Sequence, residues 1–211
     1  MIGYKTVASE ARAEQVIEKS RFIARVKPVM TREEADGFVA AVGQEHREAS
    51  HHVPAMVLGD RFQAQWASDD GEPSGTAGAP ILRMLVQEGL TNVAVVVTRY
   101  FGGVKLGTGG LVRAYTGSAK LALEKAGIRR MQERTFLGFE IEYGFFNQIQ
   151  AMARGRRFQI EETLYGEKVT LTVSAEAERA ADLRTVFSEV TAGGAILVSE
   201  ETKFAEIPAW I

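Results

Sequence analysis

The sequence contains no cysteine in its 211 residues. Disulfides, zinc–thiolate sites and thiol catalysis are therefore excluded, and histidine, aspartate and glutamate are the only good metal ligands that remain. No apolar run approaches the roughly 20 residues that a membrane-spanning helix needs. The first residues, MIGYKTVASEARAEQ, show neither a basic start nor an apolar core before a cleavage site. We therefore expect no signal peptide, no membrane contact and a cytoplasmic location.

The net charge is small, but the two parts of the chain differ in charge. The hydrophobic content of 45% and the chain length suit a globular protein of two domains. Residues 1–134 carry 18 Lys and Arg against 15 Asp and Glu, whereas residues 135–211 carry 7 against 12. Residues 99–134 hold eight basic residues and two acidic ones. This local surplus favours a polyanionic partner, although a solvated helix face balanced by acids elsewhere has the same composition.

The most informative segment is RYFGGVKLGTGGLVR at residues 99–113, which follows the apolar run VAVVV. Glycine has no Cβ, so the five glycines can take positive φ and turn successive N–H groups into a concavity that binds oxyanions. The helix that follows adds a favourable dipole. A tight strand-to-helix turn is the alternative, but it needs fewer glycines. The residues expected to bind nucleic acid or another anion are Arg99, Gly103, Lys105, Gly107, Gly109, Gly110, Arg113 and Lys120.

Two aromatic residues, Tyr100 and Phe101, lie between the apolar run and the glycines. Aromatic rings beside basic residues can stack on nucleobases. An aromatic pair at the end of a strand is more typical of a hydrophobic core, and we expect both side chains there.

A second polar segment, SDDGEPSGTAGAP at residues 68–80, is termed the acidic loop. Its carboxylates, Asp69, Asp70 and Glu72, are the available internal partners for Arg99, which stands where a buried strand ends. With His51 as a further polar partner these carboxylates could bind a metal, but their spacing lacks the pattern of calcium loops and of zinc-binding helices. Acidic glycine-rich turns are common helix-capping loops, so we expect no metal.

The first part of the chain predicts an α+β domain. Extended segments fill the first 30 residues, and a helix begins after Thr31, where Glu34 completes a capping box. Strand patterns at residues 51–58 and 61–67 flank a glycine turn, and Pro54 favours an edge position for the first of them. A helix from Pro80, a strand at residues 91–99 buried on both faces and a helix at residues 110–125 follow.

After Gly127 the pattern restarts as strand, helix, strand, strand, helix and strand. This βαββαβ order is that of the ferredoxin-like fold. We therefore expect one domain at residues 1–130 and a second at residues 134–205. Arg154, Arg156 and Arg157 most simply complement a helix C-terminus, and the apolar tail IPAWI is expected to dock on the protein.

The segments SRFIARVKPV, SDDGEPSGTAGAPIL and RYFGGVKLGTGGLVRAY resemble the YigZ/IMPACT family in its bacterial two-domain form, over nearly the whole chain. The resemblance implies an N-terminal α+β domain similar to domain IV of elongation factor G and a C-terminal domain similar to its domain V. It also implies action around translation through RNA or ribosome contact, with no reaction established. In HHVPAMVLG, which departs from the family pattern, His51 fits that pattern better than His52. Kinase regulation, a property of eukaryotic members with an additional domain, is not carried over.

Two functions follow from the sequence. The first is a non-enzymatic, translation-linked protein whose basic glycine-rich surface contacts RNA or the ribosome, while the acidic C-terminal domain contributes spacing or contacts a protein. The second is an enzyme or binding protein that holds a phosphorylated small molecule or nucleotide in the same loop, with Asp69, Asp70 or His51 as acid, base or magnesium ligand. No cofactor is expected, and no Walker-type sequence occurs.

Overall fold

The computed structural model describes residues 3–154 and 158–207, and the chain divides into two compact units. The N-terminal unit is Tyr4–Arg130, and the C-terminal unit begins at Met131. In the described ranges no helix is long and apolar enough to span a membrane. Two expectations, one for Arg156 and Arg157 and one for the apolar tail after Ile207, lie outside the described residues.

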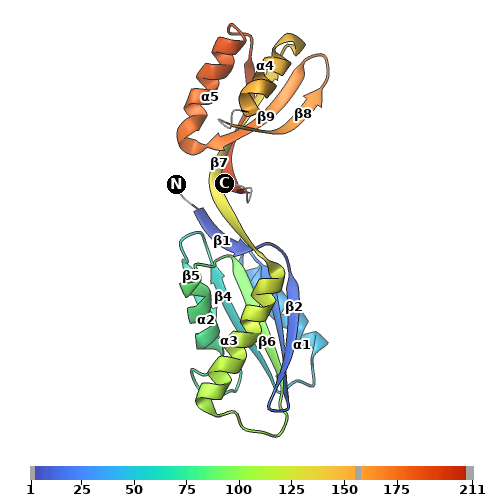
Figure 1. The fold of residues 1–211 in the computed structure, drawn as a ribbon, viewed down its shortest axis with the longest axis vertical. Helices are drawn as coiled ribbons and strands as arrows, with labels where there is room; N and C mark the ends of the chain where they lie inside the picture. The colour runs from blue at the N-terminus through green and yellow to red at the C-terminus, as the bar shows by residue number, and fades with distance from the viewer. Residues whose placement is uncertain (1–2, 155–157, 208–211) are drawn as a thin grey trace. The chain divides into compact units, whose positions relative to one another are not determined.

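The N-terminal unit is built on a five-stranded antiparallel sheet with β6 at its centre (Figure 1). In order across the sheet, the strands are β2 (Ala11–Ile17), β3 (Ser20–Pro28), β6 (Val93–Tyr100), β4 (His51–Leu58) and β5 (Ala64–Ala67). Seven of the eight residues of β6 are buried. The expected strand buried on both faces is therefore confirmed.

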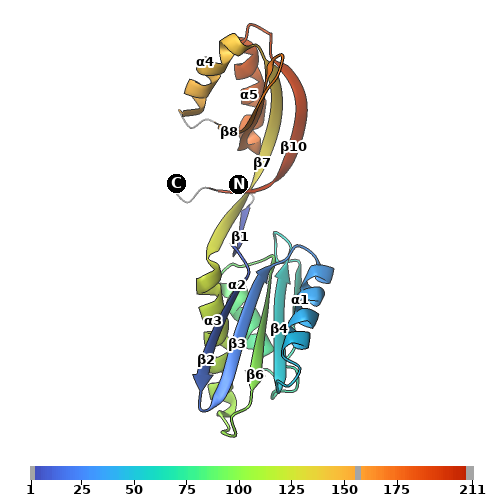
Figure 2. The same cartoon turned by 90° about the vertical axis from the view of Figure 1, so that its right-hand side faces the viewer.

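Helices cover both faces of this sheet (Figure 2). On one face lie α2 (Gly78–Gln87) and α3 (Gly107–Ala126), and on the other lies α1 (Arg32–Glu45). Val93, Val95 and Val97 of β6 join the core under α2 and α3, while Ala94 and Val96 join the core under α1. The period of two along the strand thus divides one apolar run between two cores.

The start of α1 agrees with its sequence pattern, whereas the position of β4 in the sheet does not. The expected cap of α1 is confirmed, because the Thr31 hydroxyl accepts a hydrogen bond from the Glu34 N–H at 3.2 Å. The edge position expected from Pro54 is wrong, since β4 lies between β6 and β5. Pairing with β5 begins only at Ala55, so Pro54 lies just beyond that ladder, where no N–H is needed.

The C-terminal unit confirms the expected βαββαβ order. Its elements are β7 (Ile128–Ile141), whose first three residues belong to the N-terminal unit, and then α4 (Tyr143–Arg154), β8 (Gln159–Tyr165), β9 (Val169–Glu176), α5 (Ala177–Val190) and β10 (Ile196–Glu206). The strands pair antiparallel in the ferredoxin-like order β10-β7-β9-β8. A further strand, β1 (Gly3–Val7), pairs with β7, and all its residues after Gly3 belong to the N-terminal unit. Both helices pack on one face (Figure 2), where the rings of Phe139 and Phe187 stack with centroids 4.1 Å apart.

The turn between β2 and β3 is pressed against the chain that leaves β6. Glu18 and Lys19 form this turn with φ of 45° and 64°, the left-handed conformation of tight hairpins. A Cβ on Gly102 would lie 2.0 Å from the Lys19 carbonyl oxygen. Only glycine fits at this position, because any side chain would displace backbone.

Gly102→Ala is therefore expected to destabilise the protein by about 1–3 kcal/mol, since the β2–β3 turn has to move. Urea unfolding followed by circular dichroism measures the change. Gly37→Ala in α1 is the matched control: nothing lies within 4 Å of its Cβ, and the change should be neutral or stabilise by up to about 1 kcal/mol. A wild-type unfolding midpoint for Gly102→Ala would contradict the close approach.

Candidate functional site

Three buried side chains meet where β6 ends. The Arg99 guanidinium donates from Nη1 to Glu72 Oε1 at 2.7 Å, and the Tyr115 hydroxyl donates to the same oxygen at 2.7 Å. Arg99 comes from β6, Glu72 from the acidic loop and Tyr115 from α3. The side chains of Arg99 and Glu72 are only 5% and 4% exposed. The ion pair is therefore shielded from water, and removal of either side chain would leave the other charge buried without a counter-ion.

Further groups surround the Arg99 guanidinium. Ser20 Oγ accepts a hydrogen bond from Arg99 Nη2 at 3.1 Å and another from the Gly102 N–H at 3.2 Å. The guanidinium carbon lies 5.4 Å from the ring centroid of Phe22 and 5.3 Å from that of Phe101. Arg99 thus connects the β2–β3 hairpin to the chain that leaves β6.

Tyr115 stays protonated in this setting. Burial raises the pKa of its hydroxyl, and the hydrogen bond to Glu72 raises it further. The sequence does not predict that Tyr115 and Ser20 bond to the buried ion pair. Tyr115 falls in the apolar stripe of its helix, and the one available signal is that a buried tyrosine hydroxyl needs a hydrogen-bond partner. We term the following four residues the Arg99 cluster: Ser20, Glu72, Arg99 and Tyr115.

His51 and Asp70 approach the Arg99 cluster from β4 and the acidic loop. His51 Nδ1 donates to the Asp70 carbonyl oxygen at 2.7 Å, and its Nε2 lies 3.8 Å from Glu72 Oε1. The Asp70 carboxylate accepts a hydrogen bond from the N–H of His52 at 2.5 Å. The structure therefore brings His51 to the acidic loop, and their contacts hold that loop against the first residues of β4.

Asp69 caps α2. Its Oδ1 accepts hydrogen bonds from the N–H groups of Ala77 at 3.0 Å and Gly78 at 2.8 Å, and its Oδ2 accepts one from Gly75 at 2.7 Å. Burial alone would raise the pKa of Asp69, but these hydrogen bonds outweigh it and hold the pKa below its usual value. Asp69 thus supplies the cap that the side chain of Ala77 cannot.

All three carboxylates of the acidic loop are therefore used within the protein. The sequence left open whether Arg99 pairs internally or binds a ligand, and the structure pairs it with Glu72. Arg99 belongs to the Arg99 cluster, then, and not to the rim of an anion site. Over residues 3–154 and 158–207, no three His, Asp or Glu side chains are grouped so as to hold a metal ion.

The glycine-rich segment is only partly a loop. Because α3 begins at Gly107, residues 101–106 form the β6–α3 connection, and Gly109 and Gly110 lie in the first turn of the helix. Gly103 and Gly107 have φ of 84° and 70°, whereas Gly109 and Gly110 have no positive φ. The expectation that the glycines together form a positive-φ cradle is wrong for these two, because they are helical, and also for Gly102, whose φ is not positive. The lack of side chains at Gly109 and Gly110 instead leaves the start of α3 bare.

Positive charge gathers at the start of α3. The first turn has no side-chain cap and no acidic residue, so its N–H groups present the positive end of the dipole of a 20-residue helix. The Arg113 side chain folds back over this turn, as the short distance to Gly109 shows: a Cβ on Gly109 would lie 3.7 Å from Arg113 Nη1. Lys105 and Arg113 are exposed, and within the described ranges neither forms an ion pair. This end of the helix is therefore positively charged.

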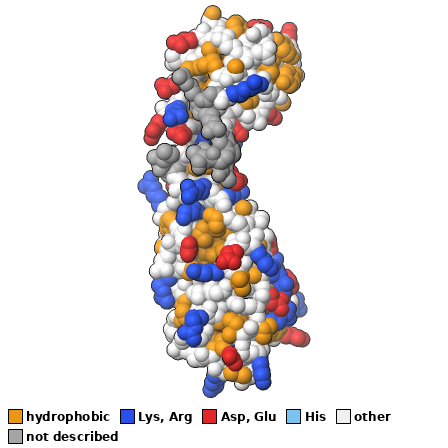
Figure 3. All heavy atoms as spheres, in the orientation of Figure 1, with side chains coloured by type: hydrophobic (Ala, Val, Ile, Leu, Met, Phe, Trp, Pro, Cys, Tyr) orange, Lys and Arg blue, Asp and Glu red, His pale blue; other side chains and the backbone are white. Residues whose placement is uncertain are grey.

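An open hollow of about 650 Å³ lies beside the start of α3. Its lining residues are Gln15, Ile17, Glu18, Val104, Lys105, Leu106, Gly110, Arg113, Ala114 and Gly117. Three of those on α3 are glycine or alanine, so a ligand can approach the helix backbone closely. Glu18 is the one acid among them. Figure 3 shows basic side chains at this end of the N-terminal unit, with an acidic one close by.

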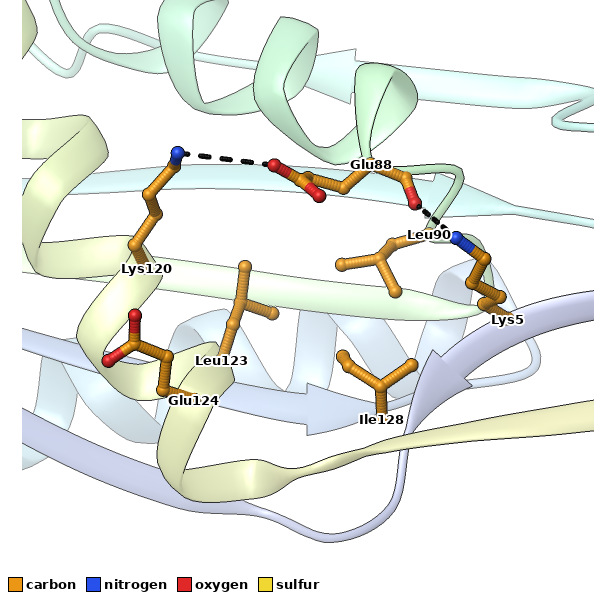
Figure 4. A pocket seen from close by; sticks show the side chains of 7 residues that line it. All are labelled: Lys5, Glu88, Leu90, Lys120, Leu123, Glu124 and Ile128. Carbon is orange, nitrogen blue, oxygen red and sulfur yellow. Dashed lines mark hydrogen bonds and ion pairs between the residues drawn. The ribbon is translucent and has the colours of Figure 1, made fainter. Parts of the chain in front are cut away.

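Lys120 does not belong to this surface. It follows Gly107 by thirteen residues, which is about 20 Å along a helix, and its Nζ lies 3.9 Å from Glu88 Oε1. It borders a separate hollow of about 270 Å³ with an apolar floor (Figure 4). The residues lining that hollow are Lys5, Glu88, Leu90, Lys120, Leu123, Glu124 and Ile128.

The two units correspond to two known domain families. Residues 18–123, which contain the Arg99 cluster, match the family described as the Impact N-terminal domain. Residues 139–193 match a domain of unknown function, DUF1949. The class is therefore that of two-domain proteins with an Impact N-terminal domain.

Curated relatives that match most of the chain carry the family name. The chain is 36% identical to IMPACT family member YvyE of Bacillus subtilis (strain 168), an alignment that covers 97% of this chain and 94% of the relative. It is 37% identical to IMPACT family member YigZ of Escherichia coli (strain K12), with 88% and 92% covered. The chain therefore belongs to the IMPACT family, as the sequence resemblance indicates.

A solved structure confirms the fold. It is 35% identical and superposes with a TM-score of 0.62, and the match covers 94% of this chain and 98% of the other. That structure is described as the crystal structure of a hypothetical protein, so it adds no activity.

Arg99→Ala leaves Glu72 buried without its cation and is expected to lower the free energy of unfolding by about 3–5 kcal/mol. Tyr115→Phe removes a single neutral donor and should lower it by about 1–2 kcal/mol. Urea unfolding measures both variants. The control is Arg61→Ala in the exposed β4–β5 turn, which should stay within about 0.5 kcal/mol of wild type. A stable Arg99→Ala protein would show that the ion pair contributes little to the fold.

Asp69→Asn is expected to remove part of the acid sensitivity of the protein. Because the pKa of Asp69 is lower in the folded state, its stabilising effect is fully present above its unfolded pKa of about 3.9 and is lost as the pH falls through the lower folded value. Asp69→Asn should therefore cost about 0.5–2 kcal/mol at pH 7 and progressively less below pH 4. Thermal unfolding between pH 7 and pH 2 measures this, and a constant difference at every pH would contradict it.

Proposed function

We propose that this protein is a translation-linked binding protein that contacts RNA, on the ribosome, through the β6–α3 connection and the first half of α3. The residues assigned to this contact are Gly103, Lys105, Gly107, Gly109, Gly110 and Arg113. Arg99 is left out because it is paired with Glu72. Lys120 is left out because it borders a different hollow.

One observation carries the proposal: the start of α3 has no side-chain cap, and the Arg113 guanidinium, which has no ion-pair partner among the described residues, lies over it. A cation at the positive end of a helix dipole is unfavourable unless an anion joins it. Within the protein, the nearby acid that lines the hollow is Glu18, which lies in the β2–β3 turn. A phosphate bound between Lys105, Arg113 and the first N–H groups of α3 would balance this charge.

The shape and chemistry of the hollow favour a macromolecular phosphate over a reacting small molecule. The hollow is open to solvent, and Glu18 is its one side chain that could act as a general base. The candidates for acid–base chemistry, Asp69, Asp70 and His51, are held in contacts of the acidic loop. We therefore propose no reaction. A phosphorylated small molecule or nucleotide bound without reaction is the second candidate, since the same positive charge would hold its phosphate.

The link to translation comes from the family resemblance, which implies RNA or ribosome contact. The C-terminal unit is assigned a different role, because residues 135–211 carry an excess of acidic residues and repel a phosphate backbone. We propose that it contacts a protein or sets the spacing on the ribosome, and that the protein works in the cytoplasm.

The variant Lys105→Glu/Arg113→Glu is expected to lose salt-sensitive co-sedimentation with ribosomes and separated subunits, because it reverses both exposed cations at the start of α3. Sedimentation at low and moderate salt measures binding. The control is Arg61→Glu, which reverses one exposed cation in the β4–β5 turn, at the opposite end of β4 from His51, and it is compared with each of the single variants Lys105→Glu and Arg113→Glu, which make the same charge change. Wild-type binding by the double variant would reject this surface. No binding by the wild-type protein, together with thermal stabilisation by a nucleotide, would favour the second candidate.

A further inference from the structure

The end of β6 exposes an aromatic ring. Phe101 is 51% exposed, although it directly follows a strand whose first seven residues are buried. The expectation that Tyr100 and Phe101 both belong to the core is therefore wrong for Phe101. A single exposed phenyl group is common on protein surfaces, so its surroundings decide whether it has a role.

Two contacts within the protein hold Phe101 in place. The Arg99 guanidinium lies 5.3 Å from the centroid of its ring, and that guanidinium is itself fixed by Glu72 and Ser20. The Phe101 N–H donates to Ser50 Oγ at 3.1 Å. The ring is therefore supported by a rigid group while half of the side chain remains open to solvent, and binding a flat ligand costs little conformational entropy.

The hydroxyl and the ring of the neighbouring Tyr100 already have partners within the protein. The Tyr100 hydroxyl bonds to His46 Nδ1 at 3.1 Å, and the Arg21 guanidinium carbon lies 5.6 Å from the centroid of the Tyr100 ring. Tyr100 is also less exposed than Phe101. Of the two rings at the end of β6, Phe101 is the one free to take a ligand.

The phosphate-attracting groups follow Phe101 closely in the chain. Lys105 is four residues further on, so the two Cα atoms are at most about 14 Å apart. Gly102 and Gly103, the two residues that directly follow Phe101, carry no side chain that could cover the ring. An exposed aromatic ring beside a positively charged surface is the arrangement that binds unpaired nucleic acid, with bases stacked and phosphates paired to cations.

We infer that Phe101 stacks on an unpaired nucleobase, so that the surface selects RNA with exposed bases over fully paired RNA. A base inside a duplex has both faces covered by its neighbours and cannot take the ring, whereas a base in a loop or single strand can. This inference rests on the proposed RNA contact. The partner is a single-stranded or looped RNA segment. One of its bases stacks on Phe101 while an adjacent phosphate binds at the start of α3.

The test compares Phe101→Leu with Phe101→Trp in the full-length protein. Fluorescence anisotropy at low salt measures binding of a labelled single-stranded RNA 12-mer and of a labelled blunt RNA duplex of the same length, and thermal unfolding with and without AMP measures binding of AMP. Phe101→Leu should weaken single-strand binding roughly tenfold and leave duplex binding unchanged, whereas Phe101→Trp should bind within about threefold of wild type. The control is Trp66→Leu, which removes another exposed aromatic residue. Urea unfolding checks that Phe101→Leu keeps the stability of the wild type.

The outcomes separate this inference from the proposed function. If Lys105→Glu/Arg113→Glu weakens RNA binding but Phe101→Leu does not, the RNA surface stands and stacking is rejected. Equal losses on single strand and duplex also reject stacking, because they indicate a general change in the surface. Binding of AMP without binding of the 12-mer overturns the RNA partner. If the wild-type protein binds no RNA and no AMP, both proposals fail.

Discussion

The buried ion pair between Arg99 and Glu72 is the interaction on which the rest of the N-terminal unit depends. It joins β6 to the acidic loop, and through Tyr115 and Ser20 it extends to α3 and to the β2–β3 hairpin. Two charges removed from water are stable only when each is fully paired. The segments that supply the Arg99 cluster therefore have little freedom to move apart, although their residues are up to 95 positions apart in the sequence.

This constraint divides the polar residues into two groups. Those that face inward, in the acidic loop and the Arg99 cluster, satisfy one another and cap α2. Those that face outward, Lys105 and Arg113, have no internal partner among the described residues. Segment 99–113 thus contributes to stability through Arg99 at its start and presents positive charge through Lys105 and Arg113 further on. The composition of residues 99–113 alone cannot distinguish these two tasks.

Much of the fold follows from local pattern, and the errors have identifiable causes. The run VAVVV predicts the central strand because only burial on both faces accommodates it, and the order of strands and helices predicts the ferredoxin-like unit. The sequence predicts that α3 begins at Gly110, three residues late, because glycine usually ends helices, whereas here Gly107 begins one. Bulkier side chains would cover the first turn of this helix. The sequence does not determine which of three acids pairs with Arg99, since only the folded loop decides which carboxylate reaches it. The exposure of Phe101 depends on the β2–β3 turn and Gly102, which no local pattern encodes.

The number of free cations limits how this surface can bind RNA. Because the charge of Arg99 is neutralised by Glu72, its field adds little outside the protein, and Lys105 and Arg113 are the charged residues of segment 99–113 that remain to attract a phosphate. Two phosphate contacts give a salt dependence of only about −1.4 in log–log slope for a single strand. Such a surface binds a phosphate backbone weakly by charge alone, so useful affinity has to come from a contact that salt does not screen. A rigidly supported aromatic ring supplies such a contact, because stacking on a base depends on overlap of apolar surfaces more than on net charge.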